Sequence, residues 1–311
     1  QNKAIRIIES AIKNDRISHA YLISGPEHVG KTTFALDIAC ALNCQSDDLM
    51  SVPCGDCRQC KRILSLVHTD VFLYDVQPSK ANSDVLSHMV TIDSLRDDFI
   101  SQVYKKPFEG KARVFIISAV EKMRSEQANV ILKTLEEPPD DTVIILLSEQ
   151  VDGIIETIVS RCQSIALNSA PNGLVEKYIK EYWPDFEAYS STELARLSKG
   201  RLGWIYNVVT DQNIMVSRSE LLNIYEDMVS NNIDSRLDVS SKLVERFQKS
   251  NDSRKEAVDV WLTLWRDVLL VKTGRINEVA NISRKETLKR IATNLSVPEI
   301  IKSIKLISSF E

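Results

Sequence analysis

The sequence lacks any apolar run near the roughly 18 residues of a membrane-spanning helix, so no membrane-spanning segment and no membrane partner are expected. Residues 1–18 alternate charged and apolar side chains, so no signal peptide is predicted, and we expect a cytoplasmic protein. Internal repeats and low-complexity segments are also missing. An excess of positive charge is absent too, because the formal net charge is −4 at pH 7. This argues against general coating of nucleic acid but allows a local basic patch, or contact through a complex.

What is present is enough to build more than one folded domain. The chain has 311 residues, of which 43% are hydrophobic and 26% are charged. This composition excludes a disordered protein, and the length predicts two or three domains.

One glycine-containing stretch fits the phosphate-binding pattern G-x-x-x-x-G-K-[ST] at every fixed position. The candidate nucleotide-binding residues are Gly25, Pro26, Glu27, His28, Val29, Gly30, Lys31, Thr32 and Thr33. An apolar segment over 20–24 precedes the loop and a segment with helical spacing over 33–42 follows it, which is the strand–loop–helix context that such a loop requires. Backbone N–H groups and the helix N-terminus would hold phosphate, Lys31 would reach the β- and γ-phosphates, and Thr32 would bind Mg²⁺. The alternative is a chance glycine turn, against which the flanking strand and helix argue.

Apolar runs and segments with helical spacing alternate over the first 170 residues. Strands are predicted over residues 19–24, 71–76, 112–118, 142–148 and 162–167. Helices are predicted over residues 4–13, 33–42, 58–67, 91–105, 125–137 and 151–160, and residues 77–89 are predicted to form a polar connection. This alternation predicts an α/β fold with a five-stranded parallel sheet, which binds ligands at the carboxyl ends of its strands.

The pattern changes after residue 171, where no further strand is predicted. Short helices are expected over 174–182, 192–197 and 204–209, and residues 214–311 are expected to be helical throughout. Ser253 and Ser296 are predicted to cap two of these helices. Trp261 and Trp265 lie on an apolar helical face, which favours packing over ligand binding.

The six cysteines are Cys40, Cys44, Cys54, Cys57, Cys60 and Cys162. In a cytoplasmic chain they are not expected to form disulfides. Cys44, Cys54, Cys57 and Cys60 have the spacing C-x₉-C-x₂-C-x₂-C, and four thiolates at this density suit a tetrahedral structural Zn²⁺. The alternative is a redox-active C-x-x-C pair, which would leave Cys44 and Cys60 without a role. Cys40 lies inside an apolar helix and is interpreted as buried packing.

Several motifs occur together in one order along the chain. They are His19-Ala20-Tyr21-Leu22, the glycine loop, the four cysteines, Leu132-Lys133-Thr134-Leu135-Glu136-Glu137-Pro138-Pro139 and Ser160-Arg161-Cys162. Together they resemble the bacterial DNA polymerase III clamp-loader subunits of the AAA+ class over residues 1–210, and more weakly beyond. The resemblance implies an AAA+ P-loop NTPase core over 1–168 with a zinc module at about 43–62, a helical lid over 169–212 and an all-α collar domain for oligomerisation over 213–311.

The resemblance also assigns roles to individual residues. It implies binding of ATP or ADP with Mg²⁺, a structural Zn²⁺ on the four cysteines, and Ser148 as a side chain that senses the γ-phosphate. Arg161 resembles the arginine finger that one loader subunit projects into the ATP site of its neighbour. The alternative for Arg161 is a surface salt bridge, for example with Glu156.

Two departures from the family pattern concern hydrolysis. The family's hydrolases carry Asp and Glu at the end of the third strand, where this sequence has Ser118 and Ala119. Glu121 follows two to three residues late, and direct use of its carboxylate is not expected because reactive geometry tolerates little displacement. In the lid, Gly203 stands where motor subunits carry an arginine, and Arg201 lies two residues early.

This pattern resembles the delta-prime subunit more than the gamma/tau motor. It predicts a subunit that binds ATP, hydrolyses it poorly and supplies Arg161 to a neighbour while the loader places a sliding clamp on primed DNA. The implied partners are delta and gamma/tau in a hetero-pentamer, with the clamp contacted indirectly and DNA contacted through the complex. Two alternatives stay open. One is a gamma/tau-like motor ATPase, and the other is an unrelated P-loop enzyme such as a small-molecule kinase, which would not account for the cysteines or the later motifs.

Overall fold

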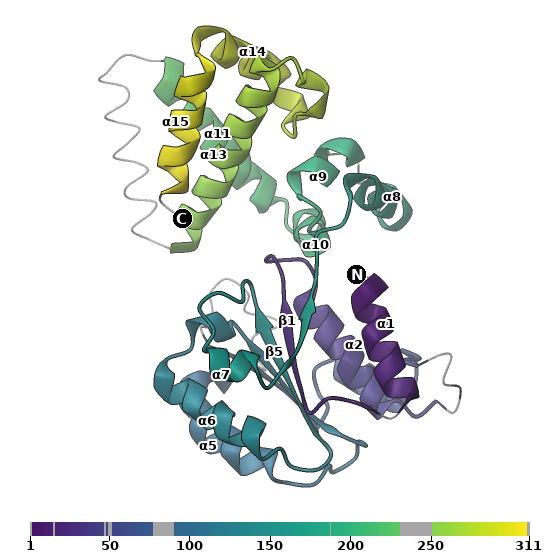
Figure 1. The fold of residues 1–311 in the computed structure, drawn as a ribbon. Helices are drawn as coiled ribbons and strands as arrows, with labels where there is room; N and C mark the ends of the chain where they lie inside the picture. Colours follow the sequence, from purple (N-terminus) through teal and green to yellow (C-terminus); the bar gives the residue numbers. More distant parts are fainter. Residues whose placement is uncertain are drawn as a thin grey trace. The chain divides into compact units, whose positions relative to one another are not determined.

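The computed structural model describes residues 2–14, 16–46, 48, 52–76, 90–186, 188–230 and 251–309. The chain forms two compact units, Gln1–Ser169 and Ala170–Glu311 (Figure 1). The predicted polar connection over 77–89 lies outside the described residues, as do residues 231–250 of the predicted C-terminal helices. None of the described helices is long and apolar enough to cross a membrane.

The first unit alternates strands and helices as predicted. Its elements are α1 (Asn2–Lys13), β1 (Ala20–Ser24), α2 (Lys31–Asn43), α3 (Arg58–Leu64), β2 (Val71–Asp75), β3 (Val90–Thr91), α5 (Ile92–Val103), β4 (Arg113–Ser118), the 3₁₀ turn η2 (Val120–Lys122), α6 (Ser125–Glu136), β5 (Thr142–Ser148), α7 (Glu156–Val159) and β6 (Gln163–Ala166). The helix predicted over 151–160 is reduced to α7, because Gly153 adopts a left-handed φ of 105° that a helix cannot accommodate.

The strands form one parallel sheet in the order β3-β2-β4-β5-β1-β6. The five predicted strands all form, and the sheet has a sixth strand at its edge that the sequence did not predict. This strand, β3, has two residues, pairs with Tyr74 and Asp75 of β2 and runs directly into α5. Two residues are too few to show an apolar period, so the segment was assigned to the start of a helix.

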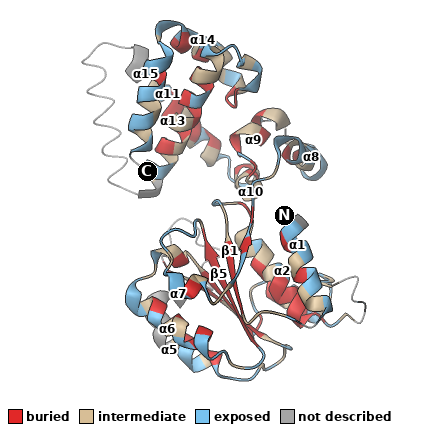
Figure 2. Cartoon of the chain, in the orientation of Figure 1, coloured by how far each residue is buried: buried red, intermediate tan, exposed pale blue. Residues whose placement is uncertain are grey.

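Both faces of the sheet are buried (Figure 2). Successive side chains of a strand point to opposite faces. In β1, Tyr21 and Ile23 pack against α1 and α2, whereas Ala20 and Leu22 pack against the helices of the other face, among them α6 and α7 (Figure 1). A strand buried on both faces has to be apolar throughout, which explains the continuous apolar runs in the sequence.

The second unit contains helices and 3₁₀ turns, and no strand is found among its described residues. Its elements are α8 (Asn172–Tyr182), α9 (Ser191–Leu197), α10 (Leu202–Thr210), α11 (Asn213–Ser230), α13 (Asn251–Lys272), η3 (Ile276–Glu278), η4 (Ile282–Arg284), α14 (Lys285–Asn294) and α15 (Val297–Ser308). The domain boundary predicted at residue 212 falls inside this unit and stays a prediction.

Packing and capping in the second unit test three of the predictions. Trp265 is buried and Trp261 is partly buried in the core of α11, α13, α14 and α15, so their assignment to packing is confirmed. Ser296 caps α15, because its N–H donates to the Glu299 carboxylate at 2.8 Å. The prediction for Ser253 was wrong, since this residue lies inside α13, which already includes Asn251.

The predicted continuous helix after residue 214 is interrupted between α13 and α14. Gly274 has a left-handed φ of 81°, and the buried carboxylate of Asp267 accepts hydrogen bonds from the N–H groups of Ala280 and Asn281 at 2.8–3.0 Å. These bonds replace helical hydrogen bonds, so the chain turns here. The turn also contacts α9, because the Glu193 carboxylate accepts a hydrogen bond from the Ser283 hydroxyl at 2.7 Å.

Candidate functional site

The glycine loop connects the end of β1 to the start of α2 at the carboxyl edge of the sheet. Gly25 donates its N–H to the carbonyl of Ser148 at 3.1 Å. A Cβ at this position would lie 2.4 Å from the carbonyl oxygen of Leu167, so only glycine fits between the two strand ends. Gly30 precedes α2 with a left-handed φ of 101°, a conformation in which other residues are strained. The backbone of the loop is therefore fixed by its two motif glycines.

The remaining loop residues surround the start of α2. The first N–H groups of α2, beginning at Lys31, have no acceptor within the helix, and a helix N-terminus attracts anions. The Lys31 ammonium donates to the carbonyls of Gly25 and Pro26 at 2.7 and 3.0 Å, so it lies over the loop. Thr32 is half-buried and Thr33 is exposed at the start of α2. Val29 is buried in the core, and the exposed side chain of Glu27 and the half-buried side chain of His28 approach each other to 3.5 Å.

The end of β4 lacks the carboxylates that hydrolysis would use. Ser118 ends the strand, and Ala119 follows in a left-handed conformation with φ 57° before η2. Neither side chain can hold a metal ion or orient water as a carboxylate does. The prediction that this strand end does not support hydrolysis stays a prediction.

Glu121, in η2, reaches the neighbouring strand end. Its carboxylate lies 2.7 Å from the hydroxyl of Ser148, the last residue of β5. Ser148 is buried and pairs in register with Ser24, the residue before the loop. The sequence predicted Ser148 as a phosphate sensor and set Glu121 aside, but the fold joins these two side chains. The sequence gave no signal for this contact, because it connects residues 27 positions apart.

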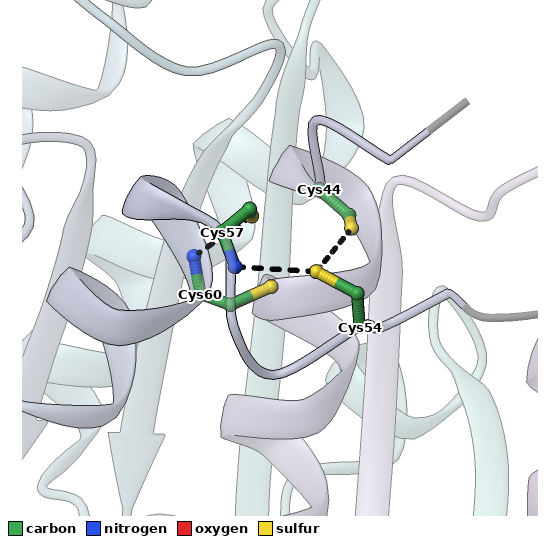
Figure 3. A group of neighbouring side chains, drawn as sticks. All are labelled: Cys44, Cys54, Cys57 and Cys60. Carbon is green, nitrogen blue, oxygen red and sulfur yellow. Dashed lines mark hydrogen bonds between the residues drawn. The ribbon is translucent and has the colours of Figure 1, made fainter. Parts of the chain in front are cut away.

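The four cysteines converge as the spacing predicted (Figure 3). Their sulfur atoms all lie within 4.8 Å of one another, and those of Cys44 and Cys54 are 3.6 Å apart. Four thiolates bound to Zn²⁺ at about 2.3 Å would be about 3.8 Å apart, so the set fits a tetrahedral ion. The separation is too long for a disulfide, whose S–S bond is about 2.05 Å. The backbone N–H of Cys57 donates to Cys54 Sγ at 3.3 Å, and that of Cys60 donates to Cys57 Sγ at 3.5 Å.

Burial and hydrogen bonding shift the pKa values of the cysteine thiols in different directions. Burial raises the pKa of the Cys57 thiol, but backbone hydrogen bonds from Gln45 and Cys60 outweigh it and lower the pKa to about 6. Burial raises the pKa of the Cys60 thiol, the opposite of the overall shift at Cys57. Burial also raises the pKa of Cys40 and of Cys162, each to about 11, which agrees with packing roles for both thiols.

A buried polar network supports the cysteine segment, and the sequence did not reveal it. Asp70 is fully buried and accepts hydrogen bonds at 2.8–3.0 Å from the N–H groups of Phe108, Glu109 and Gly110. Burial would raise the pKa of Asp70, but these bonds and Arg113 lower it overall. The loop that Asp70 holds then packs on the cysteine segment, because Lys111 Nζ donates to the carbonyl of Cys44 at 2.8 Å.

Arg161 follows α7 and lies partly exposed. Its guanidinium pairs with Glu136 at 2.9 Å and donates to the carbonyl of Thr157 at 3.0 Å. The salt bridge considered from the sequence therefore forms, but with Glu136 in place of Glu156. Glu136 ends α6 within the motif Leu132–Pro139, so two of the family motifs meet here. Exposed pairs of this kind contribute about 0–1 kcal/mol and separate easily.

In the second unit, the side chain of Arg201 binds other residues of the same unit. Its guanidinium donates to the carbonyl of Ser198 at 2.9 Å and lies 3.5 Å from the carboxylate of Asp259. Lys199 also pairs with Asp259. Gly203 is the second residue of α10 and offers no side chain. The prediction that the lid lacks a matching arginine stays a prediction.

Comparison with known proteins supports what these motifs indicate. The pattern of the family described as "DNA polymerase III, delta subunit" matches residues 1–171, more than half of the chain. The chain is 27% identical over 306 residues to DNA polymerase III subunit delta' of Bacillus subtilis, covering 98% of this chain and 88% of the relative. It is 33% identical over 185 residues to subunit delta' of Pseudomonas aeruginosa, covering 59% and 53%, and 31% identical over 180 residues to subunit gamma of Buchnera aphidicola, covering 58% and 46%.

The family match over residues 1–171 covers the parallel sheet, the glycine loop and the cysteine cluster. The matches to the Pseudomonas and Buchnera proteins span about half the length of those relatives, whereas the Bacillus match spans nearly the whole of both chains. The chain therefore belongs to the DNA polymerase III delta-subunit family and is a clamp-loader subunit with an α/β P-loop core.

Proposed function

We propose that this chain is a delta-prime-type subunit that binds nucleotide, hydrolyses it poorly and activates hydrolysis in a neighbouring subunit. One observation carries the proposal: the glycine loop after β1 keeps its motif glycines and Lys31, whereas the end of β4, on the other side of β5, presents Ser118 and Ala119 in place of carboxylates. Binding and hydrolysis are thus separated within one site. The partners would be delta and gamma/tau subunits in a hetero-pentamer that acts on a sliding clamp and on primed DNA.

The loop residues fit a nucleotide bound with Mg²⁺. The N–H groups at the start of α2 and the Lys31 ammonium would hold the phosphates, and the Thr32 hydroxyl would face the Mg²⁺. A bound Mg²⁺ would neutralise phosphate charge. On binding, Lys31 would exchange the loop carbonyls of Gly25 and Pro26 for phosphate oxygens.

The cysteine cluster fits a structural Zn²⁺. Its four sulfur atoms have the separation of a tetrahedral site, and backbone N–H groups orient two of them. The ion would stabilise a segment that connects the end of α2 to α3. A redox role for Cys54 and Cys57 would leave Cys44 and Cys60 in the cluster without a function.

Arg161 would act on the nucleotide of the neighbouring subunit. Its guanidinium is partly exposed and is held by a surface pair with Glu136, which costs little to break. A planar, permanently charged group suits the charge that develops on a transferred phosphoryl group. Glu136 would keep the side chain extended until the neighbour docks.

A second candidate function, a gamma/tau-like motor, has one observation in its favour. Glu121 brings a carboxylate to Ser148, beside the loop, so a displaced acid is present at the sheet edge. In this case the isolated chain would hydrolyse ATP by itself. The family match argues against the third alternative, an unrelated P-loop enzyme.

Single-turnover ATPase assays distinguish the two candidates. We expect the isolated chain to hydrolyse ATP at least about 10³-fold more slowly than a reconstituted loader. In the loader, Arg161→Ala is expected to lower the rate by about 10²-fold or more while nucleotide binding to this subunit is unchanged. Arg6→Ala, an exposed arginine of α1, serves as the matched control. Rapid hydrolysis by the isolated chain would favour the motor, and a fully active Arg161→Ala loader would contradict the finger.

A further inference from the structure

The group at the phosphate edge that the proposed function leaves unused is the carboxylate of Glu121. It reaches Ser148, whose own carbonyl accepts the N–H of Gly25 at 3.1 Å. Ser148 is the register partner of Ser24 in β1. The carboxylate, which comes from η2 after β4, thus contacts the residue of β5 that bonds the start of the phosphate loop.

The hydroxyl of Ser148 is fully engaged. Its oxygen lies 2.7 Å from the Glu121 carboxylate and 2.5 Å from the carbonyl of Gln150, and it accepts the Gln150 N–H at 3.3 Å. A serine hydroxyl has one proton and can donate to one acceptor at a time. Two acceptors already compete for that proton, so none is left for a phosphate oxygen. The serine is also buried, which prevents it from turning toward a ligand without breaking these bonds.

The charge on Glu121 has no partner of opposite sign among the described residues. Its described contact is the neutral hydroxyl of Ser148, and no ion pair joins it to a lysine or arginine of the described chain. Glu121 is half-buried, so solvent screens its charge only in part. A ligand with more negative charge at this edge is therefore disfavoured relative to one with less.

We propose that the nucleotide site prefers ADP over ATP, and that Glu121 with Ser148 sets this preference. The inference rests on the proposed function, since it requires that the loop binds nucleotide. The loop and Lys31 serve the phosphates that both nucleotides share. At the adjoining strand ends, the additional phosphate of ATP meets an occupied hydroxyl, an uncompensated carboxylate, and no carboxylate at Ser118 or Ala119 to hold its Mg²⁺.

Titration of the purified full-length chain with ADP and with ATP, at fixed Mg²⁺ and observed by calorimetry, tests the preference. We expect ADP to bind at least about tenfold more tightly than ATP. In Glu121→Gln, which keeps the shape of the side chain and removes its charge, the ratio should fall to about threefold or less because ATP binds better. The affinity for ADP should stay the same. Glu126→Gln, an exposed acid in the first turn of α6, removes the same charge away from Ser148 and should leave the ratio unchanged.

Each contrary outcome has a definite meaning. Equal or tighter binding of ATP by the unmodified chain overturns the preference but leaves the proposed function standing. An unchanged ratio in folded Glu121→Gln, with folding checked by circular dichroism, overturns the role of Glu121. Loss in that variant of an ATPase activity that the unmodified chain shows means that Glu121 acts on the attacking water instead. Binding of neither nucleotide refutes this inference together with the nucleotide-binding part of the proposed function.

Discussion

The phosphate loop and the cysteine cluster belong to the same unit but are built in opposite ways. In the loop, backbone conformation does the shaping, since Gly25 and Gly30 occupy positions that other residues cannot adopt without strain. In the cluster, four sulfur atoms converge on one point. The loop is complete before a ligand arrives, whereas the cluster gathers groups that repel one another once ionised. Changes in the cluster should therefore affect folding, and changes to loop side chains should affect binding.

The largest effect on zinc content and folding stability is expected when a buried sulfur atom of the cluster is removed. Cys60 is fully buried. In Cys60→Ser, zinc content should fall from about one ion per chain to nearly none, and the free energy of unfolding should fall by at least about 3 kcal/mol. Metal analysis and urea denaturation measure the two effects. Cys162→Ser, outside the cluster, should retain its metal. Full zinc content in Cys60→Ser would show that the four sulfur atoms do not act as one site.

Gly25→Ala should affect both folding and nucleotide binding, because it alters the backbone of the loop. The added methyl group would lie 2.4 Å from the Leu167 carbonyl and force two strand ends apart. We expect a loss of about 2–4 kcal/mol in the free energy of unfolding, together with loss of nucleotide binding. Gly173→Ala is the control, since it lies in α8 with no atom within 4 Å of the added carbon. It should be neutral or stabilising by up to about 1 kcal/mol in urea denaturation.

Asp70→Asn tests how far the cluster depends on its polar support. The folded state holds the pKa of Asp70 below its ordinary value, so its contribution is present above the unfolded pKa and is lost as pH falls through the folded pKa. We expect the variant to lose about 2 kcal/mol at pH 7, and the difference from the unmodified chain to shrink below about pH 4. Urea denaturation at several pH values measures this. A constant difference across that range would contradict the assignment to an ionised Asp70.

Lys31→Ala should have the smallest effect on folding. The ammonium contributes two hydrogen bonds to loop carbonyls in a partly exposed position. The free energy of unfolding should change by less than about 1 kcal/mol, while nucleotide affinity should fall by about 100-fold. Thermal melting measures the change in stability, and calorimetric titration on the same preparation measures the change in nucleotide affinity. A strongly destabilised variant would mean that the loop, like the cluster, depends on its side chains for folding.

The sequence correctly predicted the features that residues close together in the chain determine. The five longer strands and the glycine loop follow from runs of adjacent residues, and the structure contains them all. The gathering of the four cysteines followed from their spacing, because close spacing limits where the sulfur atoms can go. The two-residue strand β3 and the true start of α13 were missed, since a short strand has no period and Ser253 mimics a cap.

The contacts that were missed join residues far apart in the chain. Glu121 meets Ser148, Asp70 binds the backbone at Phe108, and Arg161 pairs with Glu136. Each depends on which strand ends and helix ends the sheet brings together, and no local pattern encodes that. The sequence offered Glu156 as an example of a partner for Arg161, whereas the guanidinium pairs with Glu136 at the end of α6.

The attachment of α9 has a mechanical consequence for the helical unit. Glu193 binds Ser283, and Arg196 donates to the carbonyls of Asn277 and Val279 at 2.6 and 2.8 Å. Several short bonds in parallel resist shear far better than one, because they must all lengthen at once. We therefore expect α9 and the segment before α14 to move together when either is displaced.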